Sequence, residues 1–513
     1  MFAAVAPPLL PMLRHTACVA LLLLAAVVQP ARADLLADAR SNSTAAVLAA
    51  IADKADVNVR SSDGTSALHW AVYNGNLALV RALLRAGADV NARNEYGSSP
   101  MSEAGVLGSE QLLELLLDAG ADVESPTLEG QTVLMSVVRT PNVKAAELLL
   151  EHGANVNPRE SWRGQTALMF ASAQSQPAMV ELLLEHGADP NLVSALEAWE
   201  RHVTAEPRPQ GRPPGALTAL LFAAREGCVA CADSLVKHGA AINQVDPNGI
   251  TPLLMATLNA RWDVATVLIA AGADVNRWDT WGRAPLYSAV DYNTVPRGGR
   301  PDRPSQDTAT PVDVARLLLE KGANPNMQLK VFPPYRSLGN DRGGDSMLTT
   351  GTTPLIRAAK AGDVEMTELL LQHGAIADLK NWPGYTPMLA AAGVGSNNID
   401  LRGRFRDEQQ CLTVAKLLLA AGARLDSRED QGRGAIHAAA QQGWNEFIRF
   451  LAASGADINL EDRQGNTALD IAMGKAATGR FASTVEPNPV TAGVLLELGA
   501  KPGSAQRNTP AQP

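Results

Sequence analysis

A Gly-Ala pair that closes a leucine-rich segment recurs along the chain and constrains its fold more than any other feature. The glycines of these pairs are Gly87, Gly120, Gly153, Gly187, Gly239, Gly272, Gly322, Gly374, Gly422, Gly455 and Gly499. They are 33 or 34 residues apart where the pattern is uninterrupted and 44 to 52 residues apart elsewhere. A period of this length predicts a row of similar small units, some of them enlarged by insertions.

The residues that open and close each unit predict a pair of short helices. Residues 63–71 read Asp-Gly-Thr-Ser-Ala-Leu-His-Trp-Ala, and residues 248–253 and 383–388 open two further units in a similar way. The Thr or Ser suits a helix N-cap, and a Pro after it costs no hydrogen bond at the first helical position. The closing glycine suits the left-handed end of a second helix. Leu and Ala at helical spacing predict narrow apolar faces that stacking would bury.

This pattern resembles the ankyrin repeat, whose units carry Thr-Pro-Leu-His openings and Gly-Ala-Asp-Val-Asn endings such as residues 87–91. The resemblance covers residues 63–501 in about eleven units and implies an all-α solenoid with short β-hairpin-like fingers. Residues 34–62 keep only the second-helix half of a unit and indicate a degenerate N-terminal capping repeat. Residues 502–513, rich in Pro, Gln and Ser, predict a disordered tail.

Five insertions interrupt the period. They fall at about residues 192–215, 291–311, 327–350, 394–410 and 474–489. The first and third follow the Asn that ends a unit and would enlarge fingers, whereas the other three would lie between the two helices of a unit. Two interpretations remain open, tolerated loop growth on the outside of the solenoid or a widened binding surface.

The N-terminus predicts export. Arg14 and His15 precede an apolar run over residues 17–28, and residues 31–33 fit a small-x-small cleavage site. Residues 1–33 are therefore expected to be a secretory signal, with a mature periplasmic or extracellular chain that begins at Asp34. The alternative, an uncleaved anchor, would need roughly 20 apolar residues to span a bilayer. Met12 is an alternative start.

Charge and motifs argue against several classes of function. The formal net charge is −9, from 44 Lys and Arg against 53 Asp and Glu, so clustered cations for nucleic acid are not expected. No Gly-x-Ser-x-Gly, Walker-type phosphate loop or Gly-x-Gly-x-x-Gly occurs. His69 and His437 fill the repeat's own motif slot. Four more histidines directly precede a closing glycine: His152, His186, His238 and His373. We expect no catalytic, cofactor or metal site.

Cys228 and Cys231 carry the most pointed chemical pattern, a Cys-x-x-Cys at a predicted helix start. A local structural disulfide or two packed thiols is the favoured interpretation. Such a pair can also lower a thiol pKa and exchange disulfides. The alternative function is therefore a thiol–disulfide or metal-handling envelope protein.

Aromatic residues gather in the predicted fingers. They are Tyr96, Trp162, Trp278, Trp281, Trp382 and Tyr385. These residues either pack between neighbouring fingers or bind a protein partner on the concave face. Trp and Tyr are favoured as binding residues in protein interfaces. The sequence thus predicts an exported, monomeric, non-catalytic scaffold that binds a protein partner, centred on the middle repeats.

Overall fold

The computed structural model describes residues 34–196, 215–294, 306–331, 349–393, 407–475, 477–478, 483–484 and 486–507. The predicted signal at residues 1–33, parts of all five insertions and residues 508–513 lie outside the described residues. None of the helices within the described ranges is long and apolar enough to cross a bilayer.

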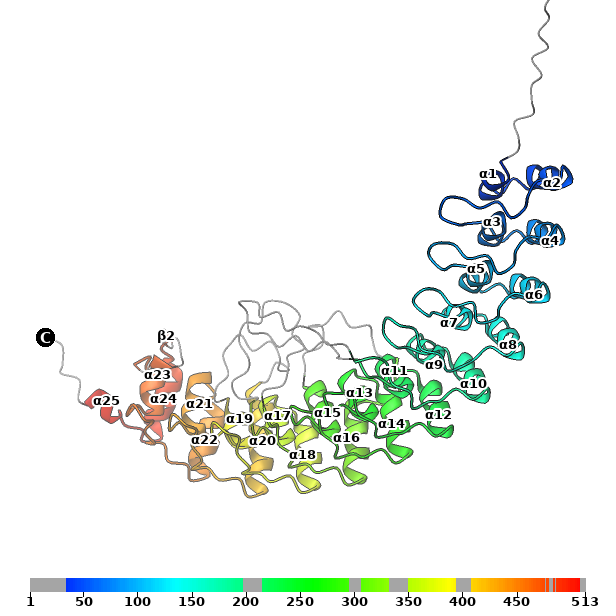
Figure 1. Ribbon diagram of the computed structural model, residues 1–513. Coiled ribbons are helices and arrows are strands. Elements are labelled where there is room, and N and C mark those ends of the chain that lie inside the picture. Colours follow the sequence, from blue (N-terminus) through cyan, green and yellow to red (C-terminus); the bar gives the residue numbers. More distant parts are fainter. Residues whose placement is uncertain are drawn as a thin grey trace, which may run out of the picture.

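The described chain forms a curved solenoid of stacked helix pairs (Figure 1). The inner helices are α1 (Leu35–Arg40), α3 (Ala67–Tyr73), α5 (Pro100–Leu107), α7 (Val133–Val138), α9 (Ala167–Ala173), α11 (Ala219–Glu226), α13 (Pro252–Leu258), α15 (Pro285–Asn293), α17 (Pro354–Lys360), α19 (Pro387–Ala392), α21 (Ala435–Gln442) and α23 (Ala468–Ala472). The outer helices are α2 (Thr44–Ala52), α4 (Leu77–Arg85), α6 (Glu110–Asp118), α8 (Val143–Glu151), α10 (Pro177–Glu185), α12 (Val229–Lys237), α14 (Trp262–Ala270), α16 (Pro311–Glu320), α18 (Val364–Gln372), α20 (Glu408–Ala420), α22 (Asn445–Ala453) and α24 (Pro489–Glu497).

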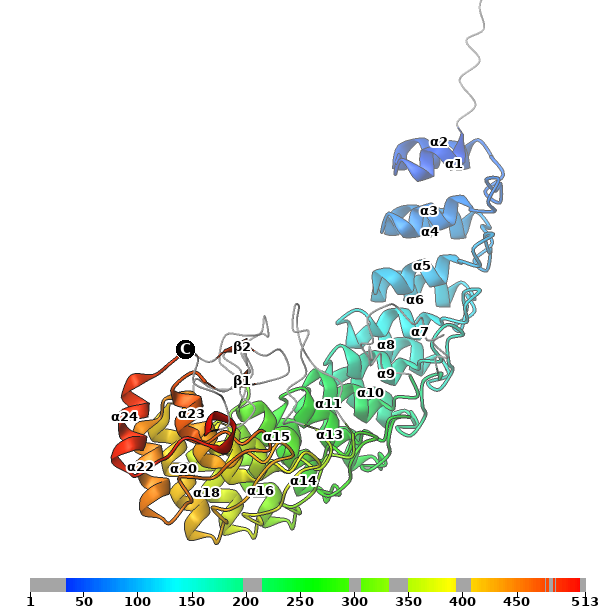
Figure 2. The same cartoon turned by 90° about the vertical axis from the view of Figure 1, so that its left-hand side faces the viewer.

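The inner helices and the fingers share one side of the curve. A finger is the segment that joins an outer helix to the next inner helix, and in the first units the fingers project on the side of the inner helices (Figure 1). The arc is also visible after a quarter turn, with the first and last helices at opposite ends (Figure 2). We number the units from unit 1 (α3 and α4) to unit 11 (α23 and α24). The all-α repeat solenoid predicted from the sequence is confirmed, with eleven complete units.

The helices begin where the sequence predicts because side chains cap them. Ser66 accepts a hydrogen bond from the backbone of His69 at the start of α3, and Thr251 does the same for Leu254 at the start of α13. Pro252 then occupies the first helical position of α13. These caps satisfy amides that the first turn of a helix leaves unpaired.

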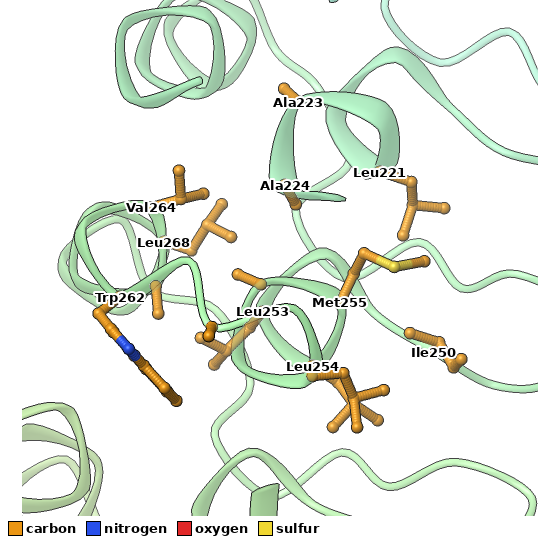
Figure 3. Close-up of a cluster of buried hydrophobic side chains, with 14 of the residues drawn as sticks. Leu221, Ala223, Ala224, Ile250, Leu253, Leu254, Met255, Trp262, Val264 and Leu268 are labelled. Carbon is orange, nitrogen blue, oxygen red and sulfur yellow. The ribbon is translucent and has the colours of Figure 1, made fainter. Parts of the chain in front are cut away.

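Small and aliphatic side chains make up the core between units. Figure 3 shows this packing for Leu221 of α11, Leu253 and Leu254 of α13, and Val264 and Leu268 of α14, all fully buried. Each helix pair covers the apolar face of its neighbour, so no unit could bury its own core alone.

Amide side chains join the units at the ends of the outer helices. Asn91 shows the pattern: its Nδ2 donates to Gly120 O (3.1 Å) and its Oδ1 accepts from Asp122 N (2.8 Å). Asn157 bonds Gly187 O and Asp189 N in the same way. The Asn of the Asp-Val-Asn motif therefore links one unit to the next, and we call this series of bonds the asparagine ladder.

The capping repeat differs from the half-unit that the sequence predicts. Residues 34–62 contain a complete short pair, α1 and α2. Asp34 caps α1 by accepting from the amides of Leu36 (3.2 Å) and Ala37 (3.3 Å). A cap formed by Asp34 replaces the Thr-Pro opening, so the first helix carries no repeat motif.

The C-terminus is also more ordered than predicted. α25 (Ser504–Arg507) lies within the predicted tail. The amide of Gly503 donates to the buried carboxylate of Asp470 (2.8 Å), and Ser504 bonds Glu461 through its amide and hydroxyl. The only strands within the described ranges, β1 (Ala477–Thr478) and β2 (Ser483–Thr484), pair antiparallel in the insertion between α23 and α24.

Candidate functional site

The fingers are held rigid by side chains that bond the turn backbone. Asn94 Oδ1 accepts from the amides of Tyr96 (3.1 Å) and Ser98 (2.9 Å). In a later finger the Glu160 carboxylate accepts from the amide of Trp162 (2.7 Å) and from two amides that follow it. The aromatic residues therefore project from fixed turns, which lowers the entropy that a partner must remove on binding.

Neighbouring fingers are also bonded to one another. The amide of Ser161 donates to Glu129 O (2.7 Å), and the amide of Ala195 donates to Arg163 O (2.6 Å). Gly164 has a φ of +61°, and a Cβ at this position would lie 2.8 Å from Ala195 N. Only glycine allows the fingers to approach this closely. The fingertips thus form a row of fixed spacing.

The six predicted aromatic residues differ in exposure and fall into four groups, the last of which is Tyr385. Tyr96, Trp162 and Trp382 are 69%, 74% and 78% exposed at their fingertips. Trp278 is 41% exposed, and the Lys330 Nζ lies 3.2 Å from its ring centroid. Trp281 is partly buried, with the Arg283 guanidinium 4.9 Å from its ring centroid.

For Tyr385 the sequence left packing and partner binding open, and its burial favours packing. Its side chain is only 7% exposed, and burial raises the pKa of its hydroxyl. Tyr385 directly follows the turn glycine Gly384. Thr65 and Ile250 occupy the same place in their fingers and are buried too. The position after the turn glycine faces the stack, so an aromatic ring there serves packing.

Sequence reasoning missed several aliphatic and aromatic residues that extend the exposed surface. Leu128 (74% exposed) and Leu196 (65%) occupy the fingers next to those of Tyr96 and Trp162. We call these four residues the fingertip row. Tyr73, Val106 and Leu107 are exposed on the inner helices α3 and α5, and we call them the helix row. Their place in the repeat was the available signal for three of them, because Tyr96, Leu128 and Trp162 lie one or two positions before a turn glycine.

The two rows belong to the first units of the solenoid. The fingertip row occupies four consecutive fingers, and the helix row lies on the inner helices of units 1 and 2. The fingers of these units project on the side of the inner helices (Figure 1). Within the described residues, large apolar side chains are thus exposed in these N-terminal fingers as well as in the middle fingers of Trp278 and Trp382 that the sequence favoured.

Cys228 and Cys231 form a disulfide at the start of α12. Cys228 is the N-cap residue, and its sulfur accepts from the amide of Cys231 (3.2 Å). Cys228 is 8% exposed and Cys231 is fully buried. Reactive thiols are usually partly exposed, so this burial favours a structural pair. Cys411 is also buried.

The histidines make structural hydrogen bonds. At the ends of four outer helices, a ring Nδ1 bonds the carbonyl four residues earlier. These are His152, His186, His238 and His373. His69 Nδ1 lies 2.8 Å from the Ser66 hydroxyl, and its Nε2 lies 3.1 Å from Ser98 O of the next finger. Within the described ranges, no three His, Cys, Asp or Glu side chains are grouped as metal ligands would be.

Several ion pairs with a buried partner lie in the C-terminal half. Arg357 is almost fully buried, and its Nε lies 2.6 Å from Asp291 Oδ1. Arg283 and Asp279 form a buried pair at 2.7 Å, and Arg433 pairs with the buried Glu429 at 3.4 Å. Each carboxylate neutralises its guanidinium, so these residues stabilise the stack and offer no free charge.

Comparison with known proteins identifies the repeat. The model of a family described as ankyrin repeats (three copies) matches residues 35–127, 101–194, 220–329, 313–400 and 407–481. The mouse B-cell lymphoma 3 protein homolog is 30% identical over 151 residues, which is 27% of this chain and 30% of that protein. A Caenorhabditis elegans homolog of transient receptor potential cation channel subfamily A member 1 is 31% identical over 122 residues, 24% of this chain and 9% of that protein.

A similar solved structure is the human ASB11 ankyrin repeat domain. It is 24% identical with a TM-score of 0.38, and the match covers 47% of this chain and 98% of that one. The matched stretches span less than a third of the length of the two relatives named above. Their similarity therefore concerns the repeat and not their other parts.

Proposed function

The chain belongs to the ankyrin-repeat family, and from this premise we propose that it is an exported, non-catalytic scaffold that binds a protein partner on the inner face of units 1 to 5. Ankyrin repeats typically serve protein–protein interaction. The observation that carries the proposal is the fingertip row, which exposes a large apolar side chain on four consecutive fingers. Large apolar side chains exposed on neighbouring elements often mark an interaction surface.

The fixed fingers support the same function. Trp and Tyr offer a large contact area at low entropic cost, and they often dominate binding energy. Trp162 also carries the Arg163 guanidinium at 4.3 Å from its ring centroid, so its ring is already oriented before a partner arrives.

Replacing Trp162 by Ala tests the proposal. Loss of a binding anchor typically costs about 2 kcal/mol, or roughly 30-fold in affinity. We expect the W162A chain to melt within a few degrees of the wild type and to lose affinity for partners cross-linked to the wild-type chain in envelope extracts. An exposed truncation changes stability by only about 0.5 kcal/mol.

Two matched controls sharpen this experiment. Leu496→Ala removes an exposed apolar side chain from the outer helix α24, and Trp382→Ala removes an equally exposed Trp from the finger of unit 9. Both variants are expected to bind normally. A W162A chain that melts early and still binds its partners would reject the proposal.

Export has its own test. A cleaved signal predicts that the protein recovered from the cell envelope begins at Asp34. N-terminal sequencing or intact mass measures this directly. An envelope protein that retains residues 1–33 would favour the anchor, and a protein found only in the cytoplasm would reject export.

The alternative of thiol–disulfide exchange rests on Cys228 and Cys231 alone. Both are buried, and one caps a helix, so the proposal treats them as structural. A free-thiol titration of the folded protein that reports rapid reduction of this pair would revive the alternative.

A further inference from the structure

The asparagine ladder shows which chemical group binds the backbone at the end of an outer helix. At six junctions, one Asn amide donates to the oxygen of the closing glycine and accepts from the backbone amide two residues later. For Asn276 these distances are 2.9 Å to Gly322 O and 2.7 Å to Asn324 N. We call this oxygen and this amide the backbone pair of a junction. A single primary carboxamide can bond both of its members.

The backbone pair of unit 10, Gly455 O and Asp457 N, has no such partner among the described residues. The ladder position that precedes it is Asp426, and an ionised carboxylate has no proton to donate to a carbonyl oxygen. The Asp426 carboxylate bonds the Arg424 guanidinium instead, at 2.9 and 2.8 Å. The donor and the acceptor of this junction are therefore available to another carboxamide.

Both residues of this backbone pair line a cleft of about 440 Å³. Leu419, Leu425, Ile436 and Leu460 contribute apolar side chains to its lining. Sites for small ligands commonly measure about 300–1,000 Å³ and combine an apolar lining with a few polar groups that orient the ligand. The cleft has both features, because the unbonded backbone pair belongs to its lining.

The charged side chains of the cleft balance one another. Arg424 and Arg428 supply two positive charges, and Asp426 and Asp457 supply two negative charges. A ligand with no net charge therefore suits the cleft better than an ion, since neither sign of charge is in excess.

We propose that this cleft binds a peptide segment through an Asn side chain with apolar residues on either side. The Asn carboxamide donates to Gly455 O and accepts from Asp457 N, as a ladder Asn does at other junctions. Its apolar neighbours contact Leu425 and Leu460. A backbone peptide group cannot replace the side chain, because a trans peptide bond places its N–H and C=O on opposite sides. The site lies in units 9 and 10 and does not depend on the proposed function of units 1 to 5.

Blocked tripeptides test the proposal on the full mature chain. The probe is acetyl-Leu-Asn-Leu-amide, and the two matched peptides carry Asp or Ala in place of Asn. We expect the Asn peptide to bind at least about tenfold more tightly than the other two, because each of them lacks one or both hydrogen bonds to the backbone pair. Isothermal titration calorimetry measures the affinities. Hydrogen exchange with mass spectrometry should show that the Asn peptide slows exchange at the Asp457 amide.

Variants of Asp426 separate competition for the backbone pair from general damage. Asp426→Asn supplies a carboxamide from the chain itself, so it should weaken the Asn peptide about tenfold without lowering the melting temperature. Asp426→Ala supplies no carboxamide and should bind the peptide like the wild type. Asp430→Asn is the matched control, because it makes the same change of charge in the same finger at an exposed residue outside the cleft lining. It should also bind like the wild type.

Four results would overturn the proposal. They are no binding of the Asn peptide, equal binding of the three peptides, wild-type affinity in the D426N chain, or an equal loss of affinity in the D426N and D426A chains. Partner capture that depends on Trp162 is a separate measurement on another part of the solenoid. The proposed function therefore stands or fails independently of these results.

Discussion

His69 and His437 couple neighbouring fingers and make the stability of the solenoid depend on pH. The Nε2 atom of His69 lies 3.1 Å from Ser98 O, and that of His437 lies 3.2 Å from Asn466 O. Burial lowers the pKa of both side chains below the ordinary value of about 6.5. The unfolded chain therefore binds protons that the folded chain resists, and stability falls as pH drops from about 6.5 toward the lowered folded pKa.

The double variant His69→Gln, His437→Gln tests this coupling by thermal melting between pH 7.5 and 5.5. We expect the wild-type melting temperature to fall toward pH 5.5 and the double variant to show a flatter profile from a lower starting value. His152→Gln, at the exposed end of α8, is the matched control and should keep the wild-type slope. Parallel profiles for the wild type and the double variant would contradict the argument.

Trp162 and Tyr385 show what a sequence can predict about single residues. The repeat places both in fingers, and it predicts the caps and the closing glycines correctly. The repeat does not show whether the residue before or the residue after a turn glycine is exposed to solvent. Trp162 precedes its glycine and is exposed, whereas Tyr385 follows its glycine and packs inside. Leu128 is aliphatic, so an aromatic pattern does not reveal it, although its exposure equals that of Trp162.

The disulfide of α12 is expected to stabilise its own unit and not the binding face. It closes a loop of a few residues, for which chain entropy accounts for about 2 kcal/mol. Changing Cys228 and Cys231 to Ser should therefore lower the melting temperature modestly and leave partner binding intact. Wild-type chain in reductant should melt like the double variant, and reductant should not affect the variant.

Loss of binding with unchanged melting in the double Cys→Ser variant would reject this role. It would favour the thiol–disulfide alternative. A chain in which Cys411 alone is changed to Ser controls for the loss of a buried thiol, since Cys411 lies in α20 outside the disulfide.

Elements at the ends of the solenoid were the hardest to predict. α1 is capped by Asp34 and packs on α3, but it lacks the repeat motif that revealed the inner helices of the other units. α25 follows a Pro-Gly pair and is fixed by Asp470 and Glu461, which lie more than 30 residues earlier. Local patterns carry no information about such distant bonds.

The asparagine ladder runs along the described solenoid, and at one junction its accepting hydrogen bond is missing. At ten junctions in the described chain, a side-chain oxygen at the ladder position accepts from a backbone amide of the next unit at 2.5 to 2.9 Å. No such bond joins Asp426 of unit 9 to Asp457 of unit 10. The Arg424 guanidinium bonds both oxygens of Asp426 (2.9 and 2.8 Å) and holds the pKa of that carboxyl below its ordinary value.

A cleft of about 440 Å³ opens at the same junction, with Arg424 and Asp426 on one side and Asp457 and Leu460 on the other. The free energy of unfolding of a solenoid is approximately the sum of the contributions of its units and of the interfaces between them. The end of the stack should therefore open first at an interface that lacks a hydrogen bond. Units 10 and 11 are therefore expected to exchange amide hydrogen faster than the units before them.

Asp426→Asn should repair this joint. An Asn side chain has an oxygen to accept from Asp457 N and an amide to donate to Gly455 O, as Asn91 and Asn157 do elsewhere. One restored hydrogen bond of typical strength should slow exchange at the Asp457 amide roughly fivefold. Hydrogen exchange with mass spectrometry measures this. Asn157→Asp is the reverse change at a junction whose hydrogen bonds are intact, and it should speed amide exchange at that junction. If both variants exchange at the wild-type rate, the ladder does not set the order in which the units open.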